Sequence, residues 1–338
     1  MKLKPVAEQT IVITGATSGV GLATAQLAAK RGARVILIAR DETALAAVAD
    51  DLRAAGGRAD FIAADVGSRE QVRAAADRII ADHGGFDSWA NIAGVGVYAR
   101  LWEISDEDHR RVFDTNYWGV VHGSTEAVRH LKDKGGAIIN MGSVTSELGT
   151  PLLSSYAASK HAVLGFTDSL RMELMREQLP VSVTIVMPVG LDTPFTEHAL
   201  NRTEQKIDLP PPIYAPELAA EAVVSATASP QRSIIVGGAG KLQTIASDLA
   251  PALSDIATTA IFSATAVDGS EPPQQGPGVH EPGTFGKVRG DYDGYVRETS
   301  LYTAARTRLP RAFGSALAGG LLAGLGAAWL FRPRLADR

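Results

Sequence analysis

The stretch IVITGATSGVG, residues 11–21, decides the fold that this sequence predicts. Its first four residues form a short apolar run typical of a buried strand, and a segment of helical period follows the glycines. Gly15 is expected to make a tight turn, Gly19 to leave room for a pyrophosphate, and Gly21 to let helix and strand pack closely. The free N–H groups at the start of that helix favour an anion. We therefore predict a dinucleotide-binding turn made of Gly15, Thr17, Ser18, Gly19, Val20 and Gly21.

Short apolar runs alternate with longer helical patterns along the rest of the chain, which indicates βαβ units around a parallel sheet. The predicted strands are residues 11–14, 34–39, 61–64, 88–92, 137–141, 181–187 and 234–236. Helical patterns lie between them, for example at residues 21–31, 42–55 and 69–83. The predicted fold class is α/β, a Rossmann-like, doubly wound, parallel seven-stranded sheet with helices on both faces. This context separates the glycine turn from an ordinary glycine-rich loop.

The end of the second predicted strand, Ile38-Ala39-Arg40, indicates which nicotinamide cofactor is preferred. NAD sites usually place a carboxylate here for the ribose 2′-hydroxyl, whereas NADP sites use an arginine for the 2′-phosphate. Arg40 fits the second pattern because a guanidinium binds phosphate bidentately, although Asp41 beside it points the other way unless it caps the next helix. We predict NADP, with NAD less favoured. Asp65, after the third strand, is a candidate to bond the adenine, or else a helix cap or turn residue.

Tyr156 and Lys160 lie four residues apart in the segment YAASK, so a helix places them on one face. Carbonyl reduction needs a proton at the oxygen, and a free tyrosine has a pKa of about 10, too high for ready exchange near neutral pH. A nearby ammonium is expected to lower that pKa, although the same spacing also arises by chance on amphipathic helices. Ser143 follows a predicted strand, 13 residues before Tyr156, where its hydroxyl would hold the substrate oxygen.

As a set, these residues resemble the short-chain dehydrogenase/reductase family in its shorter, single-domain form. The order and spacing of five motifs fit the family over about residues 10–240. These motifs are the TGxxxGxG turn, the segment Asn91-Ile92-Ala93-Gly94, the asparagine of Asn116-Tyr117-Trp118-Gly119, the serine and the YxxxK pair. The resemblance implies that Tyr156 is the general acid/base and that Lys160 lowers its pKa and bonds the nicotinamide ribose. It implies that Ser143 orients the substrate oxygen and that Asn116 holds a water of the proton relay. The implied cofactor contacts also include Val66, Asn91, Ala93, Gly94, Tyr156, Lys160, Pro188 and Thr193.

One segment departs from the family pattern. After the sixth strand the family commonly reads PGxVxT, and here residues 188–193 read PVGLDT. Val189 stands where glycine is usual, which leaves the local backbone conformation open. Thr193 keeps its place and is expected to bond the nicotinamide carboxamide.

The substrate side is less strongly marked. Residues 194–214 lie where the family keeps a variable substrate lid. Leu148, Leu152 and Leu153, between Ser143 and Tyr156, either face the pocket or serve only as packing. If they face the pocket, they indicate an apolar alcohol or ketone as substrate.

The organisation of the chain changes near residue 240. We predict a catalytic NADP-binding Rossmann domain over residues 1–240, an additional helical segment over 241–262, and a Pro/Gly-rich linker with a polar segment over 263–311. Residues 312–331 are 20 residues without a charge, long enough to cross about 30 Å of hydrocarbon as a helix. Arginines on both flanks, Trp329 and a GxxxG pair favour a single-pass C-terminal membrane anchor with the catalytic domain in the cytoplasm. A buried or interface helix in a soluble cytoplasmic enzyme is the alternative.

Composition limits the partners and the chemistry. The net charge of −4 argues against nucleic-acid binding, and the lack of cysteine excludes disulfides, thiolate metal sites and cysteine nucleophiles. We expect no metal, a small-molecule alcohol or carbonyl substrate, a membrane contact through the C-terminal helix, and a homo-oligomer. The alternative function is a catalytically silent NADP-binding sensor or scaffold at a membrane. A pure binding protein has no need of the four residues Asn116, Ser143, Tyr156 and Lys160, which favours the enzyme.

Overall fold

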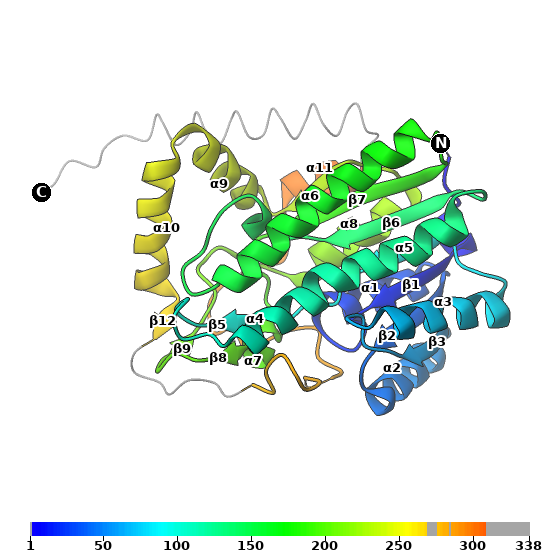
Figure 1. Cartoon of the computed structure of the whole chain (residues 1–338), viewed down its shortest axis with the longest axis horizontal. Helices are drawn as coiled ribbons and strands as arrows, with labels where there is room; N and C mark the ends of the chain where they lie inside the picture. Colours follow the sequence, from blue (N-terminus) through cyan, green and yellow to red (C-terminus); the bar gives the residue numbers. More distant parts are fainter. Residues whose placement is uncertain (1, 269–275, 284, 309–338) are drawn as a thin grey trace, which may run out of the picture.

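The computed structural model describes residues 2–268, 276–283 and 285–308. Its central layer is a seven-stranded parallel sheet in the order β11-β7-β6-β4-β1-β2-β3 (Figure 1). The strands are β1 Thr10–Thr14, β2 Arg34–Ala39, β3 Arg58–Ala63, β4 Ser88–Asn91, β6 Gly136–Met141, β7 Val181–Pro188 and β11 Ser233–Val236. The strand order reverses between β1 and β4, and ligands of open α/β sheets bind at such a switch point.

Helices cover both faces of the sheet (Figure 1). Three of them bury apolar residues mainly in one core cluster, namely α1 Gly19–Lys30, α2 Glu42–Ala54 and α8 Pro216–Ala228. Two others contribute mainly to a second cluster, namely α3 Arg69–His83 and α5 Gly119–Leu131, and α6 Ser154–Arg176 packs residues into both clusters. Along β1, Ile11 and Ile13 belong to the first cluster and Val12 to the second. The strands read as continuous apolar runs because both of their faces are buried.

The predicted seven-stranded Rossmann-like sheet is confirmed, and six of the seven strands lie within one residue of their predicted ends. The exception is β3, which begins at Arg58, three residues before the predicted start. This strand forms the edge of the sheet, with Arg58 exposed and Asp60 half-buried. Charged residues are typical of edge strands, where they discourage pairing with other chains. They also interrupt the apolar pattern on which the prediction relied.

The helical segment predicted over residues 241–262 consists of two helices, α9 Gly238–Leu249 and α10 Pro251–Thr265. Pro251 occupies the first turn of α10, a position that proline suits because its missing N–H has no partner there in any case. The two helices lie at one end of the molecule, beside the sheet layers (Figure 1).

The C-terminal segment differs from the linker predicted over residues 263–311. In its described part, β13 (Val296–Arg297) pairs with β10 (Ile213–Tyr214), and α11 (Leu301–Arg308) packs against α8 and β11. Val279 is fully buried. Proline and glycine prevent regular pairing here, but single side chains still fix the segment to the catalytic domain.

The predicted membrane anchor, residues 312–331, lies outside the described residues. Within residues 2–268, 276–283 and 285–308, no helix is both long enough and apolar enough to cross a bilayer. The anchor, the membrane contact and the homo-oligomer stay predictions from the sequence.

Gly123 lets α5 approach β4 closely. A Cβ atom at Gly123 would overlap Oδ1 of Asn91 and lie 2.5 Å from Nε1 of Trp89, and these two side chains share a buried hydrogen bond of 2.8 Å. We expect Gly123→Ala to lower the free energy of unfolding by about 1–3 kcal/mol, as overpacking of a core does. Denaturant titration would measure the change.

Gly165→Ala is the matched control. Gly165 is an exposed residue of α6, and a Cβ atom there would meet nothing within 4 Å. Alanine should raise the free energy of unfolding by about 0.5–1 kcal/mol because it restricts the unfolded chain. An equal loss of stability in both variants would contradict the packing argument.

Candidate active site

One large cavity lies at the carboxyl ends of the strands, beside the switch point between β1 and β4. It runs from the glycine turn and Arg40 to Ser143 and Tyr156. Of the residues predicted for the site, all line this cavity except Asn91 and Asn116.

The glycine turn has the geometry that a phosphate site needs. Gly15 and Gly19 have φ angles of 67° and 51°, in the left-handed region that favours glycine. A Cβ atom at Gly15 would lie 2.7 Å from Cα of Ala93, and one at Gly21 would overlap the carbonyl of Gly15. The turn therefore brings the start of α1 to the cavity wall, where its N–H groups fit an anionic pyrophosphate.

Arg40 is held by a partner that the sequence did not reveal. Its guanidinium donates to the backbone carbonyls of Val279 at 3.2 Å, His280 at 2.9 Å and Glu281 at 2.5 Å. Burial lowers the pKa of Arg40, and the charge of Arg111 lowers it further. A guanidinium has five N–H donors, so two remain for a ligand in this arrangement.

Asp65 lies beside Arg40 and is paired with Arg111. It accepts hydrogen bonds from Arg111 at 2.6 Å and from the backbone of Gly67 at 2.9 Å. Burial opposes the charged form and is the largest single effect, but the hydrogen bonds from Arg111 and Gly67 and the charges of Arg111 and Arg40 together hold the pKa of Asp65 below its usual value. This end of the cavity is therefore lined by Arg40, by Asp65, which is paired with Arg111, by Asp41, which caps α2, and by Glu281.

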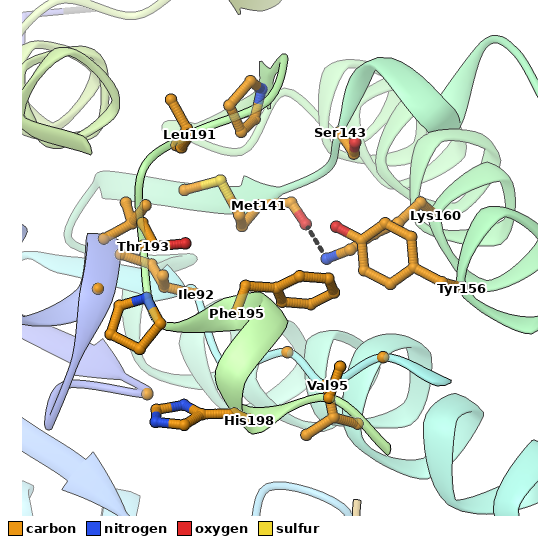
Figure 2. Close-up of a pocket in the computed structure, with 18 of the residues that line it drawn as sticks. Ile92, Val95, Met141, Ser143, Tyr156, Lys160, Leu191, Thr193, Phe195 and His198 are labelled. Atoms are coloured by element: carbon orange, nitrogen blue, oxygen red, sulfur yellow. Dashed lines mark hydrogen bonds between the residues drawn. The ribbon is translucent and has the colours of Figure 1, made fainter. Parts of the chain in front are cut away.

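Ser143, Tyr156 and Lys160 come together at the opposite end (Figure 2). Ser143 follows β6, and the other two lie one turn apart on α6. The Ser143 hydroxyl lies near Tyr156 and has a lowering effect on the pKa of the phenol. The Lys160 ammonium lies 5.5 Å from the centre of the Tyr156 ring and donates to the carbonyl of Met141 at 2.8 Å. The sequence prediction of a serine, tyrosine and lysine around one point of the cavity agrees with this geometry.

Burial has a larger effect on this group than the sequence suggested. It raises the pKa of Tyr156 to about 12, against the lowering effect of Ser143. It also lowers the pKa of Lys160 to about 8. The expected lowering of the tyrosine pKa by the lysine is not the net result here, because a buried site disfavours the charged form of both groups. Tyr156 is therefore a neutral phenol that can donate a proton.

Asn116 lies behind the cavity wall. It belongs to a π-helical turn, Asp114–Trp118, between α4 (Asp106–Phe113) and α5, and such turns occur often at functional sites. Its amide exchanges hydrogen bonds of 2.8 and 3.0 Å with the backbone of Val95 and donates at 3.0 Å to Ser159. Because the Ser159 hydroxyl donates to the carbonyl of Tyr156 at 2.7 Å, Asn116 links the loop after β4 to the catalytic helix. The water that the resemblance assigns to Asn116 stays a prediction.

Asn91 lies behind the cavity and does not line it. It is buried between β4 and β6, where it donates to Asn140 at 2.8 Å and to Ser124 at 3.2 Å. It also accepts the Trp89 hydrogen bond. All these partners are protein groups, so Asn91 supports the floor of the site, while Ala93 and Gly94 line the cavity.

The unusual valine after β7 is accommodated by glycines that face it. A Cβ atom at Gly240 would overlap Cγ1 of Val189, and one at Gly237 would lie 2.8 Å from its Cγ2. Thr193 keeps its expected place and lines the cavity near the glycine turn. The departure from the family pattern therefore leaves the cleft intact.

The wall near Tyr156 is largely apolar. Phe195 packs between two tyrosines, with ring centres 5.2 Å from Tyr156 and 6.5 Å from Tyr98. Leu148 and Leu153 line the cavity as predicted for a pocket, and Leu152 packs beside it.

Sequence reasoning missed several residues of this wall. Helix α10 contributes Ile261 and Phe262, and the two-residue strand β5, Val97–Tyr98, contributes a tyrosine. The Tyr98 hydroxyl is buried and has no hydrogen-bond partner among the described residues, and burial raises its pKa. A strand of two residues has no periodic pattern by which it can be recognised.

Comparisons with known proteins identify the family of the chain. A family model described as short chain dehydrogenase matches residues 9–204. An uncharacterized oxidoreductase of Bacillus subtilis, YxnA, is 39% identical over 312 residues, which cover 91% of this chain and 88% of that protein. A 3beta-hydroxysteroid dehydrogenase of Mediterraneibacter gnavus is 36% identical over 193 residues, covering 57% of this chain and 69% of that protein.

Solved structures give the same result. The crystal structure of a short chain dehydrogenase/reductase from Burkholderia phymatum in complex with NAD is 29% identical, with a TM-score of 0.66. The match covers 73% of this chain and 96% of that chain. The chain therefore belongs to the short-chain dehydrogenase/reductase family. It is an NAD(P)-dependent dehydrogenase or reductase with a C-terminal extension beyond the family domain.

Lys160→Met should remove a pH-dependent part of the stability. The folded protein loses the lysine proton near pH 8, whereas the unfolded chain keeps it up to about the ordinary value of 10.5. Between these values the unfolded chain binds more protons, so the free energy of unfolding of the wild type should rise with pH relative to the variant. Denaturant titrations from about pH 7 to pH 10 would measure this difference.

Lys132→Met, at an exposed position after α5, is the control and should show no such change. A difference between wild type and Lys160→Met that stays constant or falls with pH would contradict the burial of a charged lysine.

Proposed function

We propose that this protein is an NADP-dependent oxidoreductase that transfers a hydride between the nicotinamide and an apolar alcohol or carbonyl compound, with Tyr156 as general acid/base. The observation that carries the proposal is a single cavity with the glycine turn at one end and Ser143, Tyr156 and Lys160 at the other. The bound nicotinamide supplies or accepts the hydride, and the residues of the chain manage the substrate oxygen and its proton.

In the direction of reduction, Tyr156 donates its phenolic proton to the substrate oxygen. Ser143, which lines the cavity beside Tyr156, positions that oxygen. The Lys160 ammonium, 5.5 Å from the ring centre, stabilises the negative charge left on the phenolate. Its bond to the Met141 carbonyl keeps it in place, and a buried site makes this interaction stronger than it is in water.

The charges at the adenosine end support NADP. Ala39 leaves the end of β2 without a carboxylate, and Arg40 and Arg111 bring two positive charges close together. Asp65 is neutralised by its pair with Arg111. Asp41 is occupied as the cap of α2, where it accepts a hydrogen bond from the backbone of Ala44 at 3.0 Å. Arg40 is therefore the natural partner of a 2′-phosphate.

Arg40→Ala should weaken NADPH binding much more than NADH binding. Charged hydrogen bonds contribute about 1.5–3 kcal/mol, so the dissociation constant for NADPH should rise about 10- to 100-fold. Fluorescence titration with each cofactor would measure this effect, with Arg40→Lys as the variant that keeps the charge. A wild-type preference for NADH would refute the NADP assignment.

The substrate wall supports an apolar molecule with an additional oxygen. Phe195, Leu153 and Phe262 offer apolar contacts, and one of the relatives is named as a hydroxysteroid dehydrogenase. A buried hydroxyl without a partner costs about 1–3 kcal/mol, so a second substrate oxygen near Tyr98 would remove that cost. Bulky ketones with two oxygens are therefore the substrates to test first.

A screen of NADPH oxidation over aldehydes, ketones and quinones would test the reaction. We expect Tyr156→Phe to lower kcat/KM by about 10²- to 10⁴-fold, the usual contribution of a general acid. Its NADPH dissociation constant, measured by fluorescence titration, is the control for a correctly folded site. Activity that survives in Tyr156→Phe would contradict the mechanism, and NADPH binding without turnover of any substrate would favour a silent sensor or scaffold.

A further inference from the structure

A segment of the C-terminal extension crosses the glycine turn. We call residues 278–283 and 285–290 the strap. The backbone N–H of Gly286 donates to the carbonyl of Thr17 at 2.9 Å, and the N–H of Gly19 donates to the carbonyl of Lys287 at 2.9 Å. The strap is therefore bonded directly to the turn that is expected to hold the pyrophosphate.

The first end of the strap is fixed beside β2. Its carbonyls at residues 279–281 accept the three hydrogen bonds of Arg40, and the carbonyl of Val279 also accepts one from Arg111 at 3.2 Å. The Val279 side chain is fully buried in a small apolar cluster with Val97 and Val112. His280 adds a contact of 2.9 Å to Asp108 on α4.

The second end is fixed by an ion-pair cluster outside the cavity. Arg289 forms two hydrogen bonds with Glu298, at 2.7 and 2.8 Å, and contacts Glu217 on α8 at 3.0 Å. Glu298 directly follows β13, which pairs with β10. None of these three charged residues lines the cavity.

The first part of the strap, residues 278–283, forms one wall of the cavity. Gly278, Glu281, Pro282 and Gly283 line the same space as Gly15 and Arg40. The N–H of Gly19 is already bonded to the strap. The next N–H of α1 with a bonded partner is that of Leu22, which donates to the carbonyl of Ser18 at 3.1 Å. The backbone N–H groups of Val20 and Gly21, two residues that line the cavity, thus remain to bind a phosphate.

We propose that the strap completes the cofactor site by closing over the adenosine and pyrophosphate portions of a bound dinucleotide, so that the strap must open for the cofactor to leave. Arg289 is a positioning residue in this arrangement, because it holds the strap closed without touching the cavity. The inference rests on the proposed function, since it requires that the chain binds NADP or NAD. It also gives Arg40 two tasks, to hold the strap and to meet the 2′-phosphate.

The release rate of NADPH tests the strap. Bound NADPH is chased with excess NADP⁺ in a stopped-flow instrument, and nicotinamide fluorescence reports its release. We expect Arg289→Ala to raise the dissociation rate about tenfold, the effect of losing about 1.4 kcal/mol of contacts. Arg289→Lys, which keeps the charge but loses the bidentate geometry, should lie between the two. Arg78→Ala is the control, because Arg78 is an exposed residue of α3 paired only with Asp82 within the described part of the chain.

Limited trypsin digestion of the full chain gives a second readout. Lys287 lies in the strap with half of its side chain exposed, so NADPH should slow cleavage there if the strap closes over the cofactor. Faster cleavage on adding NADPH would mean that the two compete, and it would overturn the inference.

The outcomes separate the two proposals. NADPH binding with an unchanged release rate in Arg289→Ala and no protection of Lys287 would overturn the strap alone. A fluorescence titration that shows no binding of NADPH or NADH would overturn both the strap and the proposed function.

Discussion

The site depends on two close backbone contacts that only glycine allows. Gly15 lies against the backbone of Ala93 at the end of β4, and Gly21 lies against the carbonyl of Gly15. These contacts bring the ends of β1 and β4 and the start of α1 to one point, at the reversal of the strand order. A side chain at either glycine would push the helix away from the sheet, and the amides at its start would no longer line the cavity. The other functional groups are arranged around this point.

At the other end of the cavity, burial decides the chemistry. Lys160 is buried and Tyr156 is half-buried in the cavity wall, and each therefore favours its neutral form more than it does in solution. Ser143 and the carbonyl of Met141 provide the polar contacts that make such burial tolerable. When a proton leaves Tyr156, the phenol becomes a negatively charged phenolate with few other polar neighbours. In the proposed reaction, the position of the ammonium over the ring would consequently have a large effect on the energy of that proton transfer.

The sequence predicted the parts whose signal is local or periodic. The strands were recognisable because burial on both faces gives continuous apolar runs, and the pair on α6 because a helix places every fourth residue on one face. The prediction for the edge strand β3 is too short because charged side chains interrupt its apolar pattern. The net direction of the tyrosine pKa, the wall formed by Tyr98 and α10, and the contacts of Arg40 could not be predicted. Each depends on segments that are distant in the sequence. Every residue has a backbone carbonyl, so the sequence does not mark which carbonyl accepts a hydrogen bond from Arg40.

The strap also bears on how the protein is made. Arg40 and the carbonyls that hold it are 239 to 241 residues apart in the chain. During synthesis the N-terminal βαβ units leave the ribosome long before residues 279–281 do, and contacts over such a distance form late because closing a long loop is entropically costly. The sheet core can thus assemble while the adenosine end of the site is still open on one side. The cofactor site is among the last parts of the molecule to be finished, and a nascent chain that has not yet reached the strap has a nucleotide cleft without its outer wall.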